Sequence, residues 1–238
     1  RSAAETMLQA VKAKLTGEMQ RIGVMVEMRI EEISGKREAL CELAAVEYAV
    51  RQSELSAPVA TLAGGSGSIQ VTGLDSFFSF DAALKAGSKI IDDSGEVSAW
   101  RAQVSSAFET GASACQDFTA NLKAAASADG GAHVVLISGF YYAAVNAKLV
   151  DKKSSEYKYA PALEVIAKLQ AVVDGAGESS KEKANAARLI VCLQELFGES
   201  IGNVRCLFAR DWMLKDEQTG AKAAFRTTWS AGWYIEQF

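Results

Sequence analysis

The chain has 238 residues, of which 49% are hydrophobic and 23% charged, and its formal net charge is −4. This composition excludes intrinsic disorder and collagen, and a chain of this length can bury a core without help from disulfides or metals. Its 25 basic residues are scattered rather than gathered into a stripe, so we expect no nucleic-acid partner. We expect one domain over residues 1–238.

Two helices are predicted at the N-terminus. The pair Ser2 and Glu5 has the spacing of a capping box, and apolar residues at helical spacing predict one helix to about Ser34. Within it, residues 22–30 also alternate as a strand would. A second helix is predicted from about 36 to 52.

The stretch 56–68, SAPVATLAGGSGS, is predicted to be a flexible loop. A short strand over 69–72 follows. Asp75 is predicted to cap a helix that runs to about Lys85 and ends at Gly87.

The rest of the chain alternates between helices and short strands. Helices are predicted over 97–108, 112–126, 140–150, 160–173 and 180–197. Strands are predicted over 133–137 and 203–208, turns at 92–95, 129–131 and 218–220, and a polar loop over 152–159. The last segment, from Phe225, alternates as a strand or hairpin would, although its aromatic residues also fit a helix. This order favours a helix-rich α+β fold, a small sheet with helices packed on it; an all-α bundle is the alternative.

Four cysteines, Cys41, Cys115, Cys192 and Cys206, form no zinc-type spacing. They are candidates for two disulfides, with three connectivities open, or for buried free thiols. The 13 residues between Cys192 and Cys206 would let a disulfide join a helix to a strand, which would leave Cys41 to pair with Cys115. The even count is the reason for preferring disulfides.

His133 is the only histidine, at the start of an apolar strand. It could act as a general base, but we interpret it as a strand-edge residue. One histidine excludes the zinc motif H-E-x-x-H. We therefore assign no catalytic residue, no metal and no cofactor.

Two short motifs resemble known functional loops. The glycine-rich stretch 64–68 could hold a phosphate, but that site needs a strand before the glycines and a helix after them, and here a strand is predicted to follow. The pair Ser138 and Gly139 follows a strand, as a nucleophile elbow does, but Leu136 and Phe140 occupy positions where that motif has glycines. We interpret both motifs as structural.

Acidic residues Asp92, Asp93 and Glu96 surround a predicted turn. They could hold a cation, but their spacing is not that of an EF-hand, and the acidic start of a helix explains them. Near the C-terminus, Trp229, Trp233 and Tyr234 are possible interaction aromatics, although a terminal strand in the core would also need them.

Without a catalytic motif, the leading functional hypothesis is a non-catalytic secreted or cell-surface interaction domain, such as a surface antigen or a receptor-binding or adhesion module. The even cysteine count, the acidic balance and the chain's start at Arg1, which indicates a trimmed segment, favour it. Its partner would be a protein or a cell surface, with membrane anchoring through segments outside this chain. The alternatives are a carrier of a small hydrophobic ligand and a hydrolase or transferase without a short motif, and the alternative location is the cytoplasm.

Overall fold

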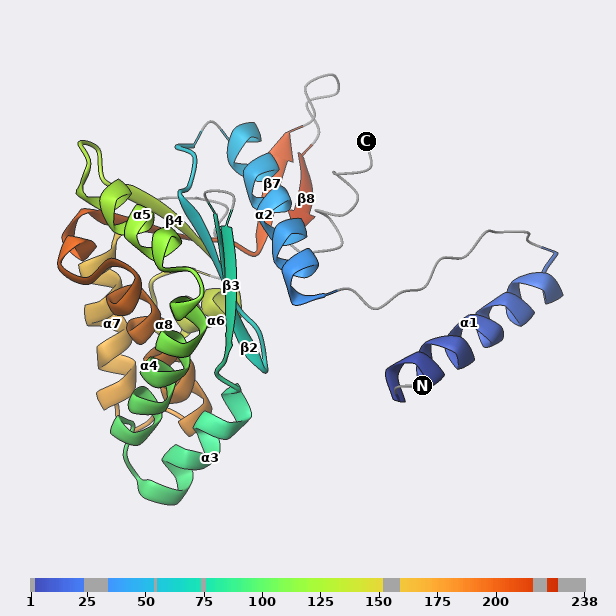
Figure 1. The fold of residues 1–238 in the computed structure, drawn as a ribbon, viewed down its shortest axis with the longest axis horizontal. Helices are drawn as coiled ribbons and strands as arrows, with labels where there is room; N and C mark the ends of the chain where they lie inside the picture. Colours follow the sequence, from blue (N-terminus) through green and yellow to red (C-terminus); the bar gives the residue numbers. More distant parts are fainter. Residues whose placement is uncertain are drawn as a thin grey trace.

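The computed structural model of the protein describes residues 3–23, 34–53, 55–73, 76–151, 159–215 and 222–226. A six-stranded mixed sheet with strand order β3-β2-β1-β4-β6-β5 forms its centre, and helices cover both faces (Figure 1). The helices are α1 (Ala3–Arg21), α2 (Gly35–Gln52), α3 (Leu84–Ser94), α4 (Ser98–Ser113), α5 (Gln116–Ser127), α6 (Gly139–Asn146), α7 (Ala162–Asp174) and α8 (Ser180–Phe197), with a 3-10 helix at Gly198–Asn203. The strands are β1 (Ala60–Gly64), β2 (Ser68–Gly73), β3 (Ser76–Asp81), β4 (Ala132–Ser138), β5 (Ala160–Pro161), β6 (Val204–Phe208), β7 (Asp211–Lys215) and β8 (Lys222–Arg226).

Strand β1 lies at the point where the sheet changes from antiparallel to parallel pairing. It pairs antiparallel with β2, which continues into β3, and parallel with β4, which in turn pairs parallel with β6. The register aligns Gly64, the last residue of β1, with Ser138, the last residue of β4. The carboxyl ends of both strands therefore meet at one edge of the sheet.

Alternation along the strands divides the core into two layers. Leu62 and Leu136 belong to the larger layer, with α3 to α8, while Ala63 and Ile137 pack with the α2 residues Val46, Ala49 and Val50. In Figure 1 the sheet accordingly lies between α2 on one side and the bundle of α4, α5, α7 and α8 on the other. Helix α8 is the centre of that bundle, and Trp100 of α4 donates a hydrogen bond to its Ala184 carbonyl (3.0 Å).

The observed sheet confirms the helix-rich α+β prediction. The flexible loop predicted over 56–68 is wrong, because this stretch contains all of β1 and the turn into β2. Every residue of β1 is buried. Its sequence, ATLAG, consists of small residues that are weak strand formers by themselves, so the pairing on both sides stabilises the strand.

The helix predicted from Asp75 to Lys85 is also wrong. That stretch contains β3, in which Phe78 and Phe80 are buried and stack on each other. Helix α3 begins only at Leu84 and includes Gly87, where the prediction ended its helix. Gly95, with φ of 72°, ends α3 instead.

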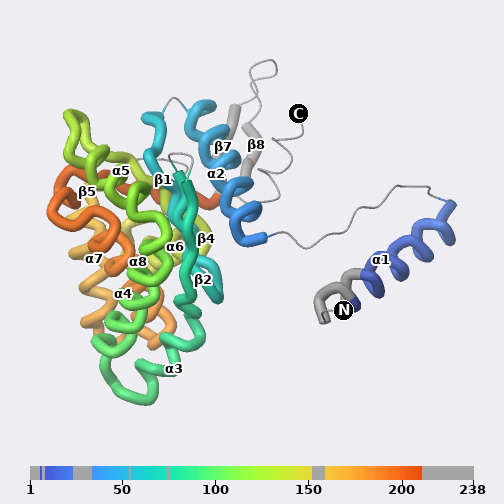
Figure 2. Tube along the Cα trace, in the orientation of Figure 1, coloured from blue at the N-terminus to red at the C-terminus, as the bar shows by residue number. Residues whose placement is uncertain are grey.

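The N-terminal helix is shorter than predicted. Within the described residues α1 ends at Arg21, and Gly23 has φ of 74°, which a helix does not adopt. Ser2 and residues 24–33 lie outside the description. Figure 2 shows α1 apart from the other elements.

The turn predicted at 92–95 is wrong, because residues 92–94 belong to the last turn of α3. The other predicted helices and strands within the described residues are confirmed, with shifted ends. The helix predicted over 140–150 ends at Asn146, and the one predicted from 160 begins at Ala162. Strand β8 includes Phe225 and Arg226 of the last segment and pairs with β7, and the rest of that segment lies outside the described residues. The turn at 218–220, most of the loop at 152–159 and the aromatic residues Trp229, Trp233 and Tyr234 lie outside the described residues. In the part of the chain that is described, no helix has the length and apolar character needed to cross a membrane.

Candidate anion-binding site

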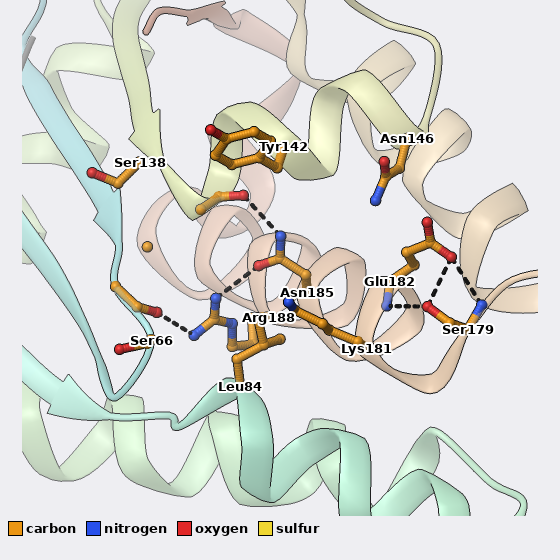
Figure 3. Close-up of a pocket in the computed structure, with 13 residues that line it drawn as sticks. Ser66, Leu84, Ser138, Tyr142, Asn146, Ser179, Lys181, Glu182, Asn185 and Arg188 are labelled. Carbon is orange, nitrogen blue, oxygen red and sulfur yellow. Dashed lines mark hydrogen bonds between the residues drawn. The ribbon is translucent and has the colours of Figure 1, made fainter. Parts of the chain in front are cut away.

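A pocket of about 600 Å³ lies at the carboxyl ends of β1 and β4. In sheets with parallel strands, ligands bind in the crevice outside these ends. Figure 3 shows the lining residues converging from the two strand ends and from helices α3, α6 and α8. They are Gly64, Gly65, Ser66, Leu84, Ser138, Gly139, Tyr142, Asn146, Ser179, Lys181, Glu182, Asn185 and Arg188.

Two glycines let the strand ends approach each other closely. A Cβ on Gly139 would lie 2.3 Å from the carbonyl oxygen of Gly64, and a Cβ on Gly64 would lie 2.9 Å from the Phe140 ring. No larger residue fits at either position without moving backbone or ring. The glycine-rich stretch therefore follows strand β1, and strand β2 follows it, as predicted, where a phosphate-binding loop would lead into a helix.

Ser138 links β4 to α6 through a strained turn. Its backbone has φ of 58° and ψ of −127°, a region that residues with a side chain rarely adopt. Such strain at a strand-to-helix junction is the backbone feature of a nucleophile elbow, although the flanking glycines of that motif are absent. The Ser138 hydroxyl donates a hydrogen bond to Oε1 of Glu42, on α2, at 3.4 Å.

Three helices begin at the pocket. Leu84 starts α3, Gly139 starts α6, and Ser179 caps α8. The amide groups at a helix N-terminus carry partial positive charge, so three such ends favour an anion between them.

Arg188 forms the buried wall of the pocket. Its residue is 0% exposed, its Nη1 donates to the carbonyls of Gly65 (3.0 Å) and Ala82 (2.8 Å), and its Nη2 donates to Asn185 (2.7 Å). Asn185 in turn donates to the Gly139 carbonyl at 2.8 Å, so the pair joins the glycine loop to the start of α6 (Figure 3).

The charge and one nitrogen of Arg188 lack protein partners among the described residues. Its Nε has no hydrogen-bond partner, and no carboxylate among the described residues forms an ion pair with it. Burial lowers the pKa of Arg188 to about 10, which leaves it protonated at neutral pH. An unpaired buried cation costs several kcal/mol, so an anion in the pocket would relieve that cost.

The other two charged residues of the pocket lie at the start of α8. Glu182 accepts from the amide (2.9 Å) and hydroxyl (2.8 Å) of Ser179 in a capping box, and these hydrogen bonds lower its pKa. Its carboxylate is therefore already hydrogen-bonded at the N-terminus of α8. Lys181 is exposed and adds positive charge at the rim.

Glu42 lies beside the pocket rather than in its lining. Burial raises its pKa to about 7, and the nearby Glu38 carboxylate acts in the same direction, while the hydrogen bond from Ser138 opposes them. Glu42 is 6% exposed, and its Oε2 has no hydrogen-bond partner among the residues that the structure describes.

The disulfide prediction is wrong, because all four cysteines are free thiols. Cys41, Cys192 and Cys206 are buried, and Cys115 is partly exposed. Burial raises the pKa of Cys192 to about 12 and also raises that of Cys206, so neither thiol is poised to react.

His133 lies near the amino end of β4, whereas the pocket is at its carboxyl end, and it does not line the pocket. Its ring packs on Tyr159 with centroids 4.5 Å apart. Burial and the nearby Arg205 lower its pKa. This environment agrees with a strand-edge residue.

The acidic turn forms no metal site. Asp92 and Asp93 lie in the last turn of α3, so their interpretation as the acidic start of a helix is wrong, and Asp92 accepts a hydrogen bond from Ser180. The described part of the chain contains no cluster of three or more His, Cys, Asp or Glu side chains that could hold a metal ion.

Arg188 and Lys181 are site residues that were not predicted from the sequence. Arg188 follows Ala186 and Ala187 and precedes Leu189, so an arginine in an apolar helix face was the available signal. A buried arginine needs a specific partner, and this position could have been recognised on that ground.

Comparisons with known proteins support the fold. No family model and no curated protein matches the chain. A solved exopolyphosphatase-like protein is similar with a TM-score of 0.52 and 13% identity, over 95% of this chain and 71% of that one. An exopolyphosphatase from Cytophaga hutchinsonii is similar with a TM-score of 0.44 and 14% identity, over 87% of this chain and 66% of that one.

These findings overturn the leading functional hypothesis. The predicted surface antigen or adhesion domain rested on disulfides that do not form and on the lack of a recognisable site. The structure instead has the fold of an exopolyphosphatase-like protein, with a pocket at the carboxyl edge of its sheet.

Proposed function

We propose that the protein binds a compound bearing phosphate groups in this pocket and hydrolyses a phosphoanhydride bond. The observation that carries the proposal is Arg188, a fully buried guanidinium whose charge has no carboxylate partner among the described residues. A phosphate oxyanion beside Arg188 would supply the missing charge.

The surroundings of Arg188 favour an anion over an apolar ligand. Of the 13 lining residues only Leu84 is aliphatic, and residues at the N-termini of α3, α6 and α8 line the same space. Arginine and helix N-termini are the groups that proteins use to bind phosphate. The small hydrophobic ligand of the carrier hypothesis is therefore the weaker candidate for this pocket.

The reaction would be attack of water on a terminal phosphorus, with cleavage of the bond to the bridging oxygen. The bridging oxygen would leave with the electron pair on the remaining phosphate chain, and the water would lose one proton. Positive groups at the pocket stabilise the charge on the transferred phosphoryl group, which is the largest contribution that such sites make. The similar exopolyphosphatase-like protein supports this reaction class.

The cytoplasm is the location that we propose for this reaction. The four cysteines are free thiols, and thiols persist where glutathione and thioredoxin keep them reduced.

The test is release of inorganic phosphate from tripolyphosphate, a phosphoanhydride chain without a base or sugar. We expect release by the full chain and its loss, by about 100-fold or more, in Arg188→Met, because a lost charge-stabilising contact costs that much. Arg188 also holds the Gly65 and Ala82 carbonyls, so a rim variant is needed that leaves the fold intact.

Lys181→Gln is that variant, and Lys183→Gln, on the same helix but outside the pocket lining, is its control. We expect weaker tripolyphosphate binding in Lys181→Gln only. Equal binding by the wild type and both variants would contradict the assignment of the pocket. Tripolyphosphate binding without phosphate release would support the assignment of the binding site and contradict the proposed hydrolase activity.

A further inference from the structure

Glu42 and Ser138 form a contact that the proposed reaction does not use. Ser138 lines the pocket, and its hydroxyl donates a hydrogen bond to Glu42 Oε1 at 3.4 Å. Glu42 comes from α2, the helix on the opposite face of the sheet from α8 and Arg188. One serine therefore joins the anion site to a buried carboxyl group.

The carboxyl group is poorly satisfied when ionised. It is 6% exposed, and within the described residues its Oε2 accepts no hydrogen bond. The charged group that faces it is the carboxylate of Glu38, one helical turn away, which repels it. Burial, a single weak hydrogen-bond donor and a neighbouring negative charge all disfavour the ionised form of this carboxyl group, so a small change in its surroundings can protonate it.

The elements packed against α2 add no positive charge to this carboxyl group in the part of the chain that is described. Strand β2 contributes Gln70, whose amide donates to Glu38 at 3.3 Å, and the end of β4 contributes Ser138. No charged side chain of strand β1 or β3 shifts the pKa of Glu42. The side chains of β7 lie outside the description.

We propose that binding of a doubly charged oxyanion in the pocket is coupled to uptake of one proton by Glu42, with Ser138 as the residue that connects the two. This inference rests on the proposed function, because it requires that the pocket binds a phosphate-like anion. It identifies Glu42 as a positioning residue, which acts on the ligand through Ser138.

The coupling has two physical causes. A doubly charged anion in the pocket adds a third negatively charged group near Glu42 and Glu38, so protonation of Glu42 removes a repulsion. A protonated Glu42 can also donate its hydrogen to Ser138 Oγ, which reverses the present hydrogen bond and leaves the Ser138 hydroxyl hydrogen for the ligand. Both effects favour the anion when Glu42 is neutral.

The test uses sulfate, whose charge does not change between about pH 5.5 and about pH 8.5, whereas phosphate esters titrate near pH 6. We expect the Kd of the full chain for sulfate to rise about fivefold or more over this range at constant ionic strength, which is a typical coupling between two sites. Calorimetry in buffers with different ionisation enthalpies should show proton uptake on binding.

Three variants test which residues cause the pH dependence of sulfate binding. Glu42→Gln, which has the same shape and no charge, should bind sulfate as tightly at high pH as the wild type does at low pH, with no proton uptake. Glu38→Gln should keep the coupling but move its midpoint to lower pH, because it removes the neighbouring charge. Ser138→Ala should reduce the coupling while Glu42 stays in place.

His133→Asn is the matched control, since it removes the only histidine, a group that also titrates near neutral pH. It should leave the coupling unchanged. Sulfate binding that does not depend on pH, or a dependence that persists in Glu42→Gln, would overturn the inference and leave the proposed function intact. Absence of sulfate binding at every pH, together with absence of tripolyphosphate binding, would overturn both.

Discussion

At the scale of single residues, two buried ionisable groups of opposite charge, Arg188 and Glu42, lie near the same edge of the sheet. Arg188 is protonated and pairs with no carboxylate among the described residues, while burial raises the pKa of Glu42 to about 7. Hydrogen bonds to carbonyls compensate Arg188 in part, whereas the carboxyl group of Glu42 has a single weak hydrogen bond among the described residues, the 3.4 Å contact with Ser138. The folded protein therefore retains a cost at each position, as ligand sites commonly do.

Glu42 should make the stability of the free protein depend on pH. Because its pKa is raised from 4.5 to about 7, the folded state binds more protons than the unfolded state between these values. Its contribution to stability is thus fully present below about pH 4.5 and is lost as the pH rises through about 7, by roughly 3 kcal/mol in total.

We therefore expect Glu42→Gln to be more stable than the wild type by about 1–3 kcal/mol at about pH 8, and nearly equal to it at about pH 5. Urea denaturation at the two pH values measures this. Glu47→Gln, an exposed change on the same helix, should show no such difference between pH values. A Glu42→Gln variant that is destabilised equally at both would contradict the raised pKa.

At the scale of elements, close approaches between helices depend on glycines that the sequence presents as breaks. Gly87 lies within α3, where a Cβ would be 2.3 Å from the ring of Trp100 on α4. Trp100 is 1% exposed and is held by its hydrogen bond to α8. The glycine is therefore needed for the packing of α3 against the bundle.

Gly87→Ala should lower the free energy of unfolding by about 1–3 kcal/mol, because overpacking against Trp100 outweighs the roughly 1 kcal/mol gained in helix propensity. Thermal or urea denaturation measures the loss. Gly17→Ala is the control, since a Cβ at Gly17 in α1 meets no atom within 4 Å. Equal stability of Gly87→Ala and the wild type would show that α3 shifts freely.

The contrast between predicted and observed elements has a physical cause. Helix α8 and strand β4 were predicted closely because their periodicity and β-branched residues are strong local signals. Strand β1 was missed because ATLAG gains its strand conformation from pairing with β2 and with β4, and β4 lies far along the chain. The miss also hid the strand that precedes the glycines at 64–68, whereas the strand predicted to follow them is observed as β2.

The pocket could be predicted only in part for the same reason. Gly64, Ser138 and Arg188 come from three elements, and their meeting depends on the β1–β4 register and on the packing of α8. No spacing along one sequence contains that information. The motifs at 64–68 and 138–139 were nevertheless visible as residues of the right type.

At the scale of the whole molecule, the buried cysteines lie in the core around the sheet. Cys192 is in α8 and Cys206 in β6, both at 0% exposure, and Cys41 is buried in α2. Only Cys115, before α5, is partly exposed. The thiols therefore report on the integrity of the core on both faces of the sheet.

Thiol titration should follow this arrangement. We expect protein purified without reductant to show four free thiols after denaturation, and the native protein to react first at Cys115, with the buried three reacting only on unfolding. Labelling followed by peptide mapping measures the order. Fewer than four thiols after denaturation would restore the disulfide hypothesis.

The position of β1 also has a consequence for how the chain acquires its structure. Its antiparallel contacts with β2 are local, across a turn of four residues between Gly64 and Ile69, whereas its parallel partner Val135 lies far along the chain. Contacts between residues close in sequence form sooner than contacts between distant residues, because closing a longer loop costs more entropy. The glycine loop can therefore take shape at an early stage of folding, while Ser138 joins it only when β4 docks. The two halves of the pocket meet in one of the last steps of assembly, so a ligand that bridges them stabilises the completed fold rather than an intermediate.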